Sequence, residues 1–290
     1  MFQENTARLA STIDGRALAA TLRTSVHASS VKLIARGIEP CLAIILVGDD
    51  PASEAYATSL QREGARCAVR VQRSLLPGHA SSSELIAALE MLGGDPLVHG
   101  IILQQPLPAH LSIEEIIAAM PVNKDVDAAS PTSQGRLSGQ LGNGFIPATP
   151  LAVMALLRHT KGWPLRGRRV AVVGKSAVVG LPVALLLLQE NATVTVTHKD
   201  TIDLGRHLRD AEVVISATGV PGLIKGDMIA PGAVVIDVGT TFVDGVLKGD
   251  IDSASVAPVA SELTPVPGGV GPLTNVALMQ NVLRAAEATL

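Results

Sequence analysis

The stretch RRVAVVGKSAVVGLPVALLLLQENATVTVTH (168–198) determines the fold class of this sequence. It starts with a run of Val and Ala, turns between two glycines, continues as an apolar segment at 178–189, and ends in alternating Thr and Val. A strand, a helix and a second strand at this spacing predict a βαβ unit, which requires a parallel sheet. The runs AEVVISATG (211–219) and AVVIDVG (233–239) extend the same series.

The region before this stretch shows a similar alternation. Asp14 can cap a helix that stops near Gly37, and further helices are expected through Tyr56, from Ser81, and over 113–119. Strands are expected at 41–48, 68–74 and 99–104. Two such series in one chain predict an α/β protein with two domains.

The composition agrees with this fold class. A chain of 290 residues can form two domains, and 47% apolar residues with only 2% aromatics suit parallel strands buried by helices. The net charge of −3 offers no electrostatic basis for binding nucleic acid or an anionic membrane. The longest apolar run, 181–188, is too short to span a bilayer, and the first residues do not resemble a secretory signal.

Two cysteines bear on the compartment. Cys41 and Cys67 lie in different expected elements, and a disulfide between them is not expected. Buried, reduced thiols predict a cytoplasmic protein.

Two segments rich in Gly and Pro are expected to be loops. The first spans 121–150, and a loop of that length is usually functional or a domain junction. Thr149 and Pro150 can then serve as the N-cap and first residue of a helix. The second loop is TPVPGGVGP (264–272), followed by a terminal helix over 273–290.

The turn GKSAVVG (174–180) follows a strand and opens a helix. Gly174 permits the tight turn, and free N–H groups at the helix start can face a pyrophosphate. Ser176 replaces the middle glycine of the full dinucleotide fingerprint, so the turn alone is equally compatible with a structural role. A P-loop is excluded because Arg169 occupies the position of its first glycine.

Cofactor preference follows from the end of the next strand. NAD sites usually carry an acid there for the ribose hydroxyls, whereas this sequence has Thr197, His198 and Lys199. Lys175 and Lys199 flank the expected ribose position, which favours the 2′-phosphate of NADP. Two solvated surface lysines are the alternative, and Asp200 keeps NAD as the less favoured cofactor.

Asp125 and Asp127 are the acidic pair of the first loop. They could serve acid–base or metal chemistry, although turn formation and capping are commoner uses of Asp in such loops. No His, Cys and Asp cluster has metal-ligand spacing, so no metal is expected.

Several segments together resemble one family, the bifunctional methylenetetrahydrofolate dehydrogenase/cyclohydrolases (FolD-type). They occur in the family's order along nearly the whole chain. The most specific are PVPGGVGP (265–272) and VVGKSAVVGLP (172–182); the others are IDG (13–15), VGDDPASEAY (47–56), GIILQQPLP (100–108), KDVD (124–127), GRL (135–137), ATP (148–150), VTHKDT (196–201), SATGVPG (216–222), VIDVG (235–239) and GD (249–250).

The resemblance implies a domain organisation. It predicts a catalytic, folate-binding domain at 1–146 plus 273–290, an NADP-binding Rossmann-type domain at 147–272, and a substrate cleft between them. The family is commonly homodimeric, and its substrate is a tetrahydrofolate carrying a one-carbon group.

The resemblance also implies residue roles. Tyr56 would pack on the folate, Gln104 would be the active-site glutamine, and Asp127 would hold the pterin amino group. The loop residues Pro267, Gly268 and Gly269 would line the substrate cleft. The implied cofactor-binding residues are Gly174, Lys175, Ser176, Val179, Gly180, His198, Lys199 and Thr218.

The sequence departs from the family's pattern at four places. The family has a proton-handling lysine four residues after the tyrosine, and Leu60 stands there. Arg62 cannot replace it, because it lies on another helix face and a guanidinium is not a base. The other departures are Gln105 for Leu, Ala128 for Gly and Ser133 for Asn.

These departures lead to a specific functional expectation. Oxidation moves a hydride to the nicotinamide and needs no proton acceptor on the enzyme, whereas hydrolysis of the methenyl product needs proton transfers. We therefore expect an NADP-dependent dehydrogenase with weak or absent cyclohydrolase activity. The alternatives are a fully bifunctional enzyme, a non-catalytic folate- or dinucleotide-binding paralogue, and a dehydrogenase acting on another one-carbon carrier.

Overall fold

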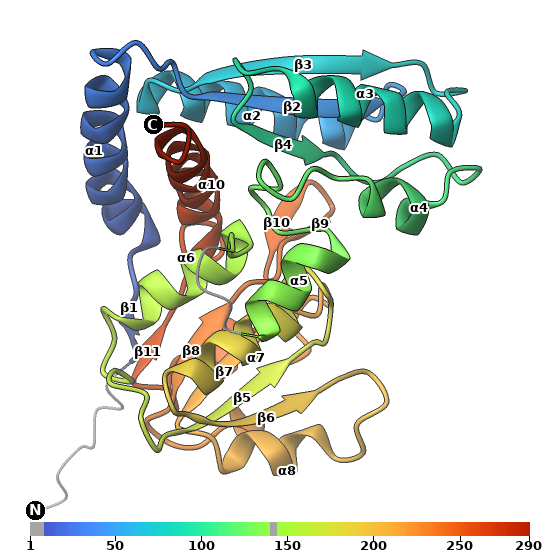
Figure 1. Cartoon of the computed structure of the whole chain (residues 1–290). Helices are drawn as coiled ribbons and strands as arrows, with labels where there is room; N and C mark the ends of the chain where they lie inside the picture. The colour runs from blue at the N-terminus through green and yellow to red at the C-terminus, as the bar shows by residue number, and fades with distance from the viewer. Residues whose placement is uncertain (1–8, 140–143) are drawn as a thin grey trace, which may run out of the picture. The chain divides into compact units, whose positions relative to one another are not determined.

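The computed structural model describes residues 9–139 and 144–290 (Figure 1). Its internal contacts divide the chain into two compact units. One contains the described residues up to Leu18 together with Thr149–Leu273, and we call it the dinucleotide unit. The other contains Ala19–Ala148 with Thr274–Leu290, and we call it the catalytic unit.

The dinucleotide unit is built on a six-stranded parallel sheet, which confirms the predicted fold class. The strand order is β1-β11-β8-β7-β5-β6. The bounds are β1 (Ser11–Thr12), β5 (Arg169–Val173), β6 (Thr193–Thr197), β7 (Val213–Ser216), β8 (Val234–Asp237) and β11 (Glu262–Leu263). Every residue of the inner strands β7 and β8 is buried, as expected for apolar runs covered on both faces.

Short helices and one hairpin complete this unit. They are α6 (Ala148–Leu157), α7 (Gly180–Gln189), α8 (Leu204–Arg209), the 3-10 helix Gly226–Met228, α9 (Ser253–Val256), and the antiparallel pair β9 (Thr241–Val243) and β10 (Val246–Lys248). The chain runs from β5 to β6 on one side and continues through β7 and β8 on the other. The sheet order therefore reverses at β5, and ligands of such sheets bind beyond the carboxyl ends of the strands at that point.

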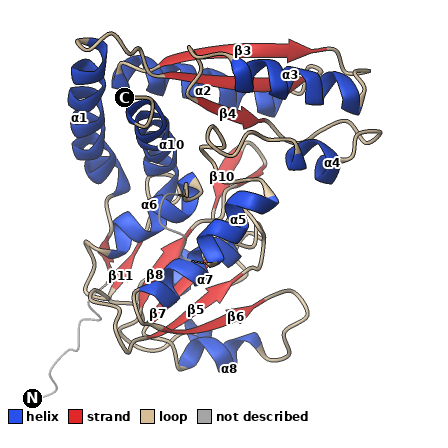
Figure 2. Ribbon diagram, viewed as in Figure 1, coloured by secondary structure: helices blue, strands red, loops and turns tan. Residues whose placement is uncertain are grey.

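The catalytic unit contains a three-stranded parallel sheet of order β3-β2-β4 (Figure 2). Its strands are β2 (Cys41–Val47), β3 (Arg70–Leu76) and β4 (Gly100–Leu103). The helices are α1 (Gly15–Ile34), whose first turn belongs to the other unit, α2 (Pro51–Cys67), α3 (Ser82–Gly94), α4 (Ile113–Ala118), α5 (Pro131–Ser138) and α10 (Val270–Glu287). The central strand β2 is buried at every position and forms the core with α3 and α4.

Helix α10 is joined to the catalytic unit by a buried amide. Asn281 donates from Nδ2 to the carbonyl oxygens of Val126 and Ile146, each at 2.7 Å. Val282 packs close to Gly100, where a Cβ would crowd it. The terminal helix thus closes the unit that contains Asp127.

The N-terminal segment differs from the predicted domain organisation. Residues up to Leu18 were expected in the catalytic domain, but β1 pairs in parallel with β11 at the edge of the six-stranded sheet. Backbone hydrogen bonds to a strand about 250 positions away cause this placement, for example from Ser11 N to Ser261 O at 2.9 Å.

Three local expectations were wrong. The loop expected over 121–150 contains helix α5, whose N-cap Ser130 accepts from Ser133 N and whose first residue is Pro131. Helix α6 begins at Ala148, before the expected cap at Thr149. Helix α10 begins at Val270, because Pro272 lies in the first turn, where its missing N–H breaks no helical bond.

Both cysteines are free and buried. Within 9–139 and 144–290, no helix combines the length and the apolar character that crossing a bilayer requires.

Candidate functional site

The turn after β5 is shaped by two glycines. Gly174 has a φ of 114°, and a Cβ there would collide with the carbonyl oxygen of Ala217, which follows β7. A Cβ on Gly180 would collide with the carbonyl oxygen of Gly174. The close approach of these backbones leaves no room for side chains, so the turn lies directly against the segment after β7.

The same turn presents backbone donors at the start of α7. Ser176 Oγ accepts from Val179 N at 3.2 Å and Gly180 N at 3.4 Å. Both bonds are long, and Ser176 and Val179 carry exposed or partly exposed atoms. These N–H groups can therefore turn to an anionic ligand at the helix start.

Lys175 and Lys199 occupy the same edge of the sheet. Val173 pairs in register with Thr197, and each lysine stands two residues beyond its strand end. Both side chains are exposed, and neither has an ion-pair partner among the residues that the structure describes. Two unpaired cations at one strand edge can hold a phosphate.

His198 and Thr218 are held by hydrogen bonds between backbone N–H groups and side chains. His198 N donates to Thr201 Oγ1 at 2.9 Å, and its ring Nδ1 accepts from Asp200 N at 3.3 Å. Thr218 N donates to the carboxylate of Asp250 at 2.6 Å. Thr218 follows β7 and is therefore next to the Gly174 turn.

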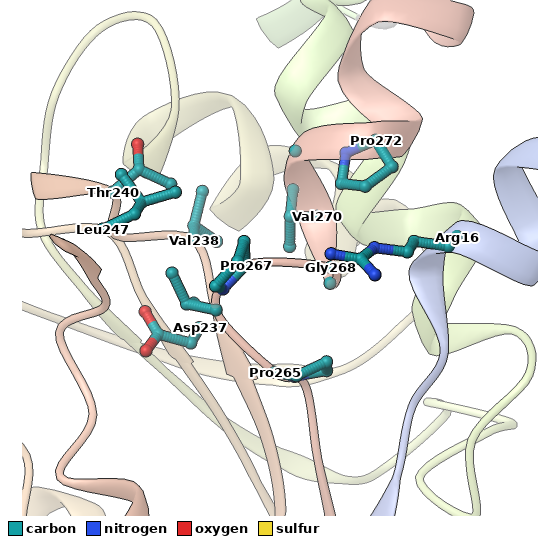
Figure 3. Close-up of a pocket in the computed structure, with 13 residues that line it drawn as sticks. Arg16, Asp237, Val238, Thr240, Leu247, Pro265, Pro267, Gly268, Val270 and Pro272 are labelled. Carbon is teal, nitrogen blue, oxygen red and sulfur yellow. The ribbon is translucent and has the colours of Figure 1, made fainter.

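The Gly/Pro loop after β11 lines a pocket of about 140 Å³ within the dinucleotide unit (Figure 3). Pro267, Gly268 and Gly269 contribute to it, as do residues that the sequence did not single out, among them Arg16 and Asp237. The Arg16 guanidinium points to Gly268, whereas the Asp237 carboxylate points away from the loop (Figure 3). Gly268 has a φ of 120°, a backbone conformation in which a residue with a side chain would be strained.

In the catalytic unit, Asp127 is a carboxylate with few compensating contacts. Its Oδ1 accepts one hydrogen bond, from Ala148 N at 2.8 Å. Burial raises the pKa of Asp127 to about 6, with a smaller contribution from the charge of Asp125. A carboxylate that titrates near neutrality and retains acceptor capacity is suited to bind a donor group of a ligand.

Asp125 has a different role. Its two oxygens accept from Ala129 N and Ser130 N, both at 2.9 Å, and the residue is 1% exposed. It therefore forms the turn that positions Asp127. The turn-forming role expected for this pair applies to Asp125, and only Asp127 keeps free acceptor capacity.

Tyr56 and Leu60 lie one turn apart on α2. Tyr56 is partly exposed. Burial of the phenol, and to a smaller extent the negative charge of Asp127, raises the pKa of Tyr56, so the phenol stays neutral. Leu60 is completely buried.

Gln104 directly follows β4. Its backbone N donates to Ile45 O at 2.9 Å, and its side-chain amide donates to Gln105 O at 2.8 Å. Ser53 of α2 contacts the same carbonyl at 3.4 Å. The structure thus brings the start of α2 next to the end of β4, and Gln105 itself is exposed.

The remaining family departures, Ala128 and Ser133, are buried. Ala128 has a φ of 47°, in the left-handed region that favours glycine. Ser133 is 1% exposed and shares a hydrogen bond with Ser130, the N-cap of α5. Within the described part of the chain, no group of three or more His, Cys, Asp or Glu side chains could hold a metal.

The fold and these sites define a two-unit α/β protein with a doubly wound parallel sheet of the dinucleotide-binding class. Two family models match the chain. The tetrahydrofolate dehydrogenase/cyclohydrolase catalytic domain matches residues 13–127, and the NAD(P)-binding domain of the same family matches residues 147–290.

Individual relatives agree with this match. The bifunctional protein FolD of Albidiferax ferrireducens is 46% identical over 278 residues, which cover 96% of each chain. The crystal structure of FolD from Campylobacter jejuni has a TM-score of 0.94 at 38% identity, covering 97% of this chain and 99% of that one. The Trypanosoma brucei methylenetetrahydrofolate dehydrogenase-cyclohydrolase, complexed with NADP and an inhibitor, has a TM-score of 0.91 at 36% identity, covering 97% and 98%.

The chain belongs to the tetrahydrofolate dehydrogenase/cyclohydrolase family. It is therefore an enzyme, with a catalytic domain and an NAD(P)-binding domain, as the sequence motifs predicted.

Proposed function

We propose that this enzyme oxidises 5,10-methylenetetrahydrofolate to 5,10-methenyltetrahydrofolate with NADP, and that its cyclohydrolase activity is weak or absent. The observation that carries the second half is Leu60. A buried leucine stands where the family's proton-handling lysine is expected, one turn from Tyr56.

The dinucleotide unit fits the cofactor. At the Gly174 turn, side chains at positions 174 and 180 would collide with neighbouring backbone, so glycine leaves the start of α7 open. The backbone N–H groups there can donate hydrogen bonds to a pyrophosphate. Lys175 and Lys199 supply the charge that a 2′-phosphate would need. When bound, the nicotinamide would take the hydride that leaves the methylene carbon.

The catalytic unit supplies orientation. Asp127, ionised above about pH 6, would accept hydrogen bonds from the pterin amino group. Tyr56, kept neutral, would pack its ring on the folate, and Gln104 would offer its amide at the end of β4. These groups bind and orient the substrate without accepting a proton, which is sufficient for oxidation.

Hydrolysis of the methenyl group makes a further demand. Water must lose a proton as it attacks, and Leu60 can neither accept nor donate one. The names of the relatives favour a second candidate, a fully bifunctional enzyme in which another group activates the water.

An absorbance assay with methylenetetrahydrofolate and each dinucleotide tests the proposal. We expect methenyl product to accumulate in the presence of NADP and to decay at the rate of the buffer control. Rapid decay would show the bifunctional enzyme. Tight folate or dinucleotide binding without turnover would show a non-catalytic paralogue, and turnover of another carrier only would show a changed substrate.

On the family resemblance we further propose a cytoplasmic homodimer. Light scattering coupled to size-exclusion chromatography tests the dimer, since a mass near the 29.9 kDa of one chain would contradict it.

A further inference from the structure

Two buried carboxylates lie next to each other in the dinucleotide unit, one at the carboxyl end of β8 and one just after β10. Asp237 is the last residue of β8, and Asp250 follows β10; they are 3% and 0% exposed. No described basic side chain forms an ion pair with either of them. Burying two neighbouring acids without a counter-ion lowers the stability of the fold unless hydrogen bonds compensate them. The hydrogen bonds of each acid therefore show what it does in the structure.

Asp250 holds the segment that follows β7. One oxygen, Oδ2, accepts from Ser216 Oγ at 2.9 Å and from Thr218 N at 2.6 Å. The other oxygen, Oδ1, is buried without a hydrogen-bond partner and lies against Gly239, where a Cβ would collide with it. Half of the carboxylate is thus uncompensated, while the other half fixes residues 216–218.

Asp237 fixes Asp250 in turn. Asp237 Oδ1 accepts from Asp250 N and Gly239 N, and Oδ2 accepts from Ile251 N, all at 3.0 Å. A Cβ on Gly249 would collide with Asp237 Oδ2, so glycine is required beside each acid. The pair therefore joins the ends of β7, β8 and β10 into one hydrogen-bonded corner.

That corner supports the dinucleotide turn. The carbonyl of Ala217, between the two groups that Asp250 holds, is the atom against which Gly174 packs. Gly219 O also accepts from Thr241 Oγ1 of β9 at 3.0 Å. A shift of residues 216–219 would therefore move or open the Gly174 turn.

We propose that Asp250 is a positioning residue for the dinucleotide, whose buried carboxylate, held by Asp237, keeps residues 216–219 in the conformation that meets the cofactor. This inference rests on the proposed dinucleotide site and adds a residue that does not itself touch the ligand.

The test compares four variants with the wild-type enzyme. Asp250→Ala removes the acceptor, Asp250→Asn retains a neutral acceptor oxygen, and Ser216→Ala removes one of the two donors. Asp252→Asn is the matched control, because this nearby carboxylate makes no capping hydrogen bond. NADP affinity is measured by titration calorimetry, thermal unfolding is recorded for each variant, and kcat and the KM for folate are determined.

We expect Asp250→Ala to raise the Kd for NADP about tenfold or more, because losing these hydrogen bonds to a charged group would lower the share of molecules whose residues 216–219 hold the binding conformation by a similar factor. Asp250→Asn should restore affinity to within about threefold of the wild type, since the backbone donor of Thr218 keeps a partner. The KM for folate should stay unchanged in every variant, and the control should match the wild type.

Equal NADP affinity in the wild type, Asp250→Ala and Ser216→Ala would overturn the inference. A parallel rise in the folate KM, with no recovery in Asp250→Asn, would also overturn it, because that pattern shows general loosening. If Asp250→Ala does not fold, Ser216→Ala decides, with a smaller rise in Kd expected. A wild-type enzyme that binds no NADP would instead contradict the proposed function itself.

Discussion

At the scale of single residues, we expect Leu60 to limit the enzyme to the dehydrogenase activity. Its side chain is completely buried, so Leu60→Lys must place an ammonium in an apolar setting, which lowers its pKa toward neutrality and costs stability. We expect a partial gain of methenyl hydrolysis, below the roughly 10²–10⁴-fold that general acid–base catalysis contributes. Loss of methenyl absorbance measures it.

Two controls separate proton chemistry from packing. Leu60→Met keeps an apolar side chain of similar size and should hydrolyse no faster than the wild type. Gln61→Lys places the same ammonium on the adjacent, partly exposed position and should also fail. A wild-type enzyme that hydrolyses methenyltetrahydrofolate as fast as it forms it would refute the role assigned to Leu60.

We expect the ionised carboxylate of Asp127 to lower the stability of the fold while it strengthens folate binding. Burial raises its folded-state pKa above the unfolded value, from 3.8 to about 6. The free energy of unfolding therefore has its full value with respect to this group below about pH 4, where Asp127 is protonated in both states. It falls as the pH rises from about 4 to about 6, and above pH 6 the total loss is up to about 3 kcal/mol. Asp127→Asn should therefore unfold at a higher temperature than the wild type at pH 8, with the difference vanishing near pH 4.

The same variant should lose folate turnover while it still binds NADP. Wild-type folate affinity should fall as pH drops through 6, because the carboxylate loses its charge. Unchanged folate KM in Asp127→Asn would show that residues 124–127 form only a turn.

Ala128 carries backbone strain that glycine would relieve. A left-handed conformation costs an L-residue about 1–2 kcal/mol, and glycine's larger unfolded-state entropy offsets part of the gain. Ala128→Gly should raise the free energy of unfolding by about 0.5–1 kcal/mol in urea titrations. The control Ala55→Gly, at an exposed position in the interior of α2, should lower the free energy of unfolding by about 1 kcal/mol. A change of the same sign in both variants would contradict this explanation.

At the scale of elements, we expect the lysines beyond the carboxyl ends of β5 and β6 to set the preference for NADP over NAD. A charge-assisted contact to phosphate contributes about 1.5–3 kcal/mol, so Lys175→Ala and Lys199→Ala should each raise the KM for NADP about tenfold or more. The KM for NAD should hardly change. Lys225→Ala, an exposed lysine of the same unit, serves as the control. Equal losses with both dinucleotides would show that the lysines do not read the 2′-phosphate.

At the scale of the whole molecule, the chain passes between its units near residues 18, 148 and 273. The catalytic unit therefore depends on α10, which supplies buried apolar residues and the Asn281 amide. A fragment of residues 1–148 should show no cooperative thermal unfolding by circular dichroism, because its core lacks this helix. A synthetic peptide of residues 270–290 should restore part of the transition, and cooperative unfolding of the fragment alone would contradict the prediction.

The sequence by itself determined the features that depend on local pattern. Runs of Val and Ile, helix caps and a glycine-bounded turn specify strands, helices and the dinucleotide turn through interactions within a few residues. The parallel sheets, and the strand–turn–helix unit around Gly174, could therefore be predicted. Helix α5 was within reach as well, since Ser130 and Pro131 form a start signal that the surrounding Gly and Ser obscured.

Only the tertiary structure decided the features that join distant segments. The pairing of β1 with β11, the contact of Asn281 with Val126, and the corner that Asp250 forms with Ser216 connect residues 34 to about 250 positions apart. No local period or spacing encodes such pairs, because packing of the complete chain selects them. The same holds for Asp127, whose raised pKa arises from burial that no neighbouring residue in the sequence reveals.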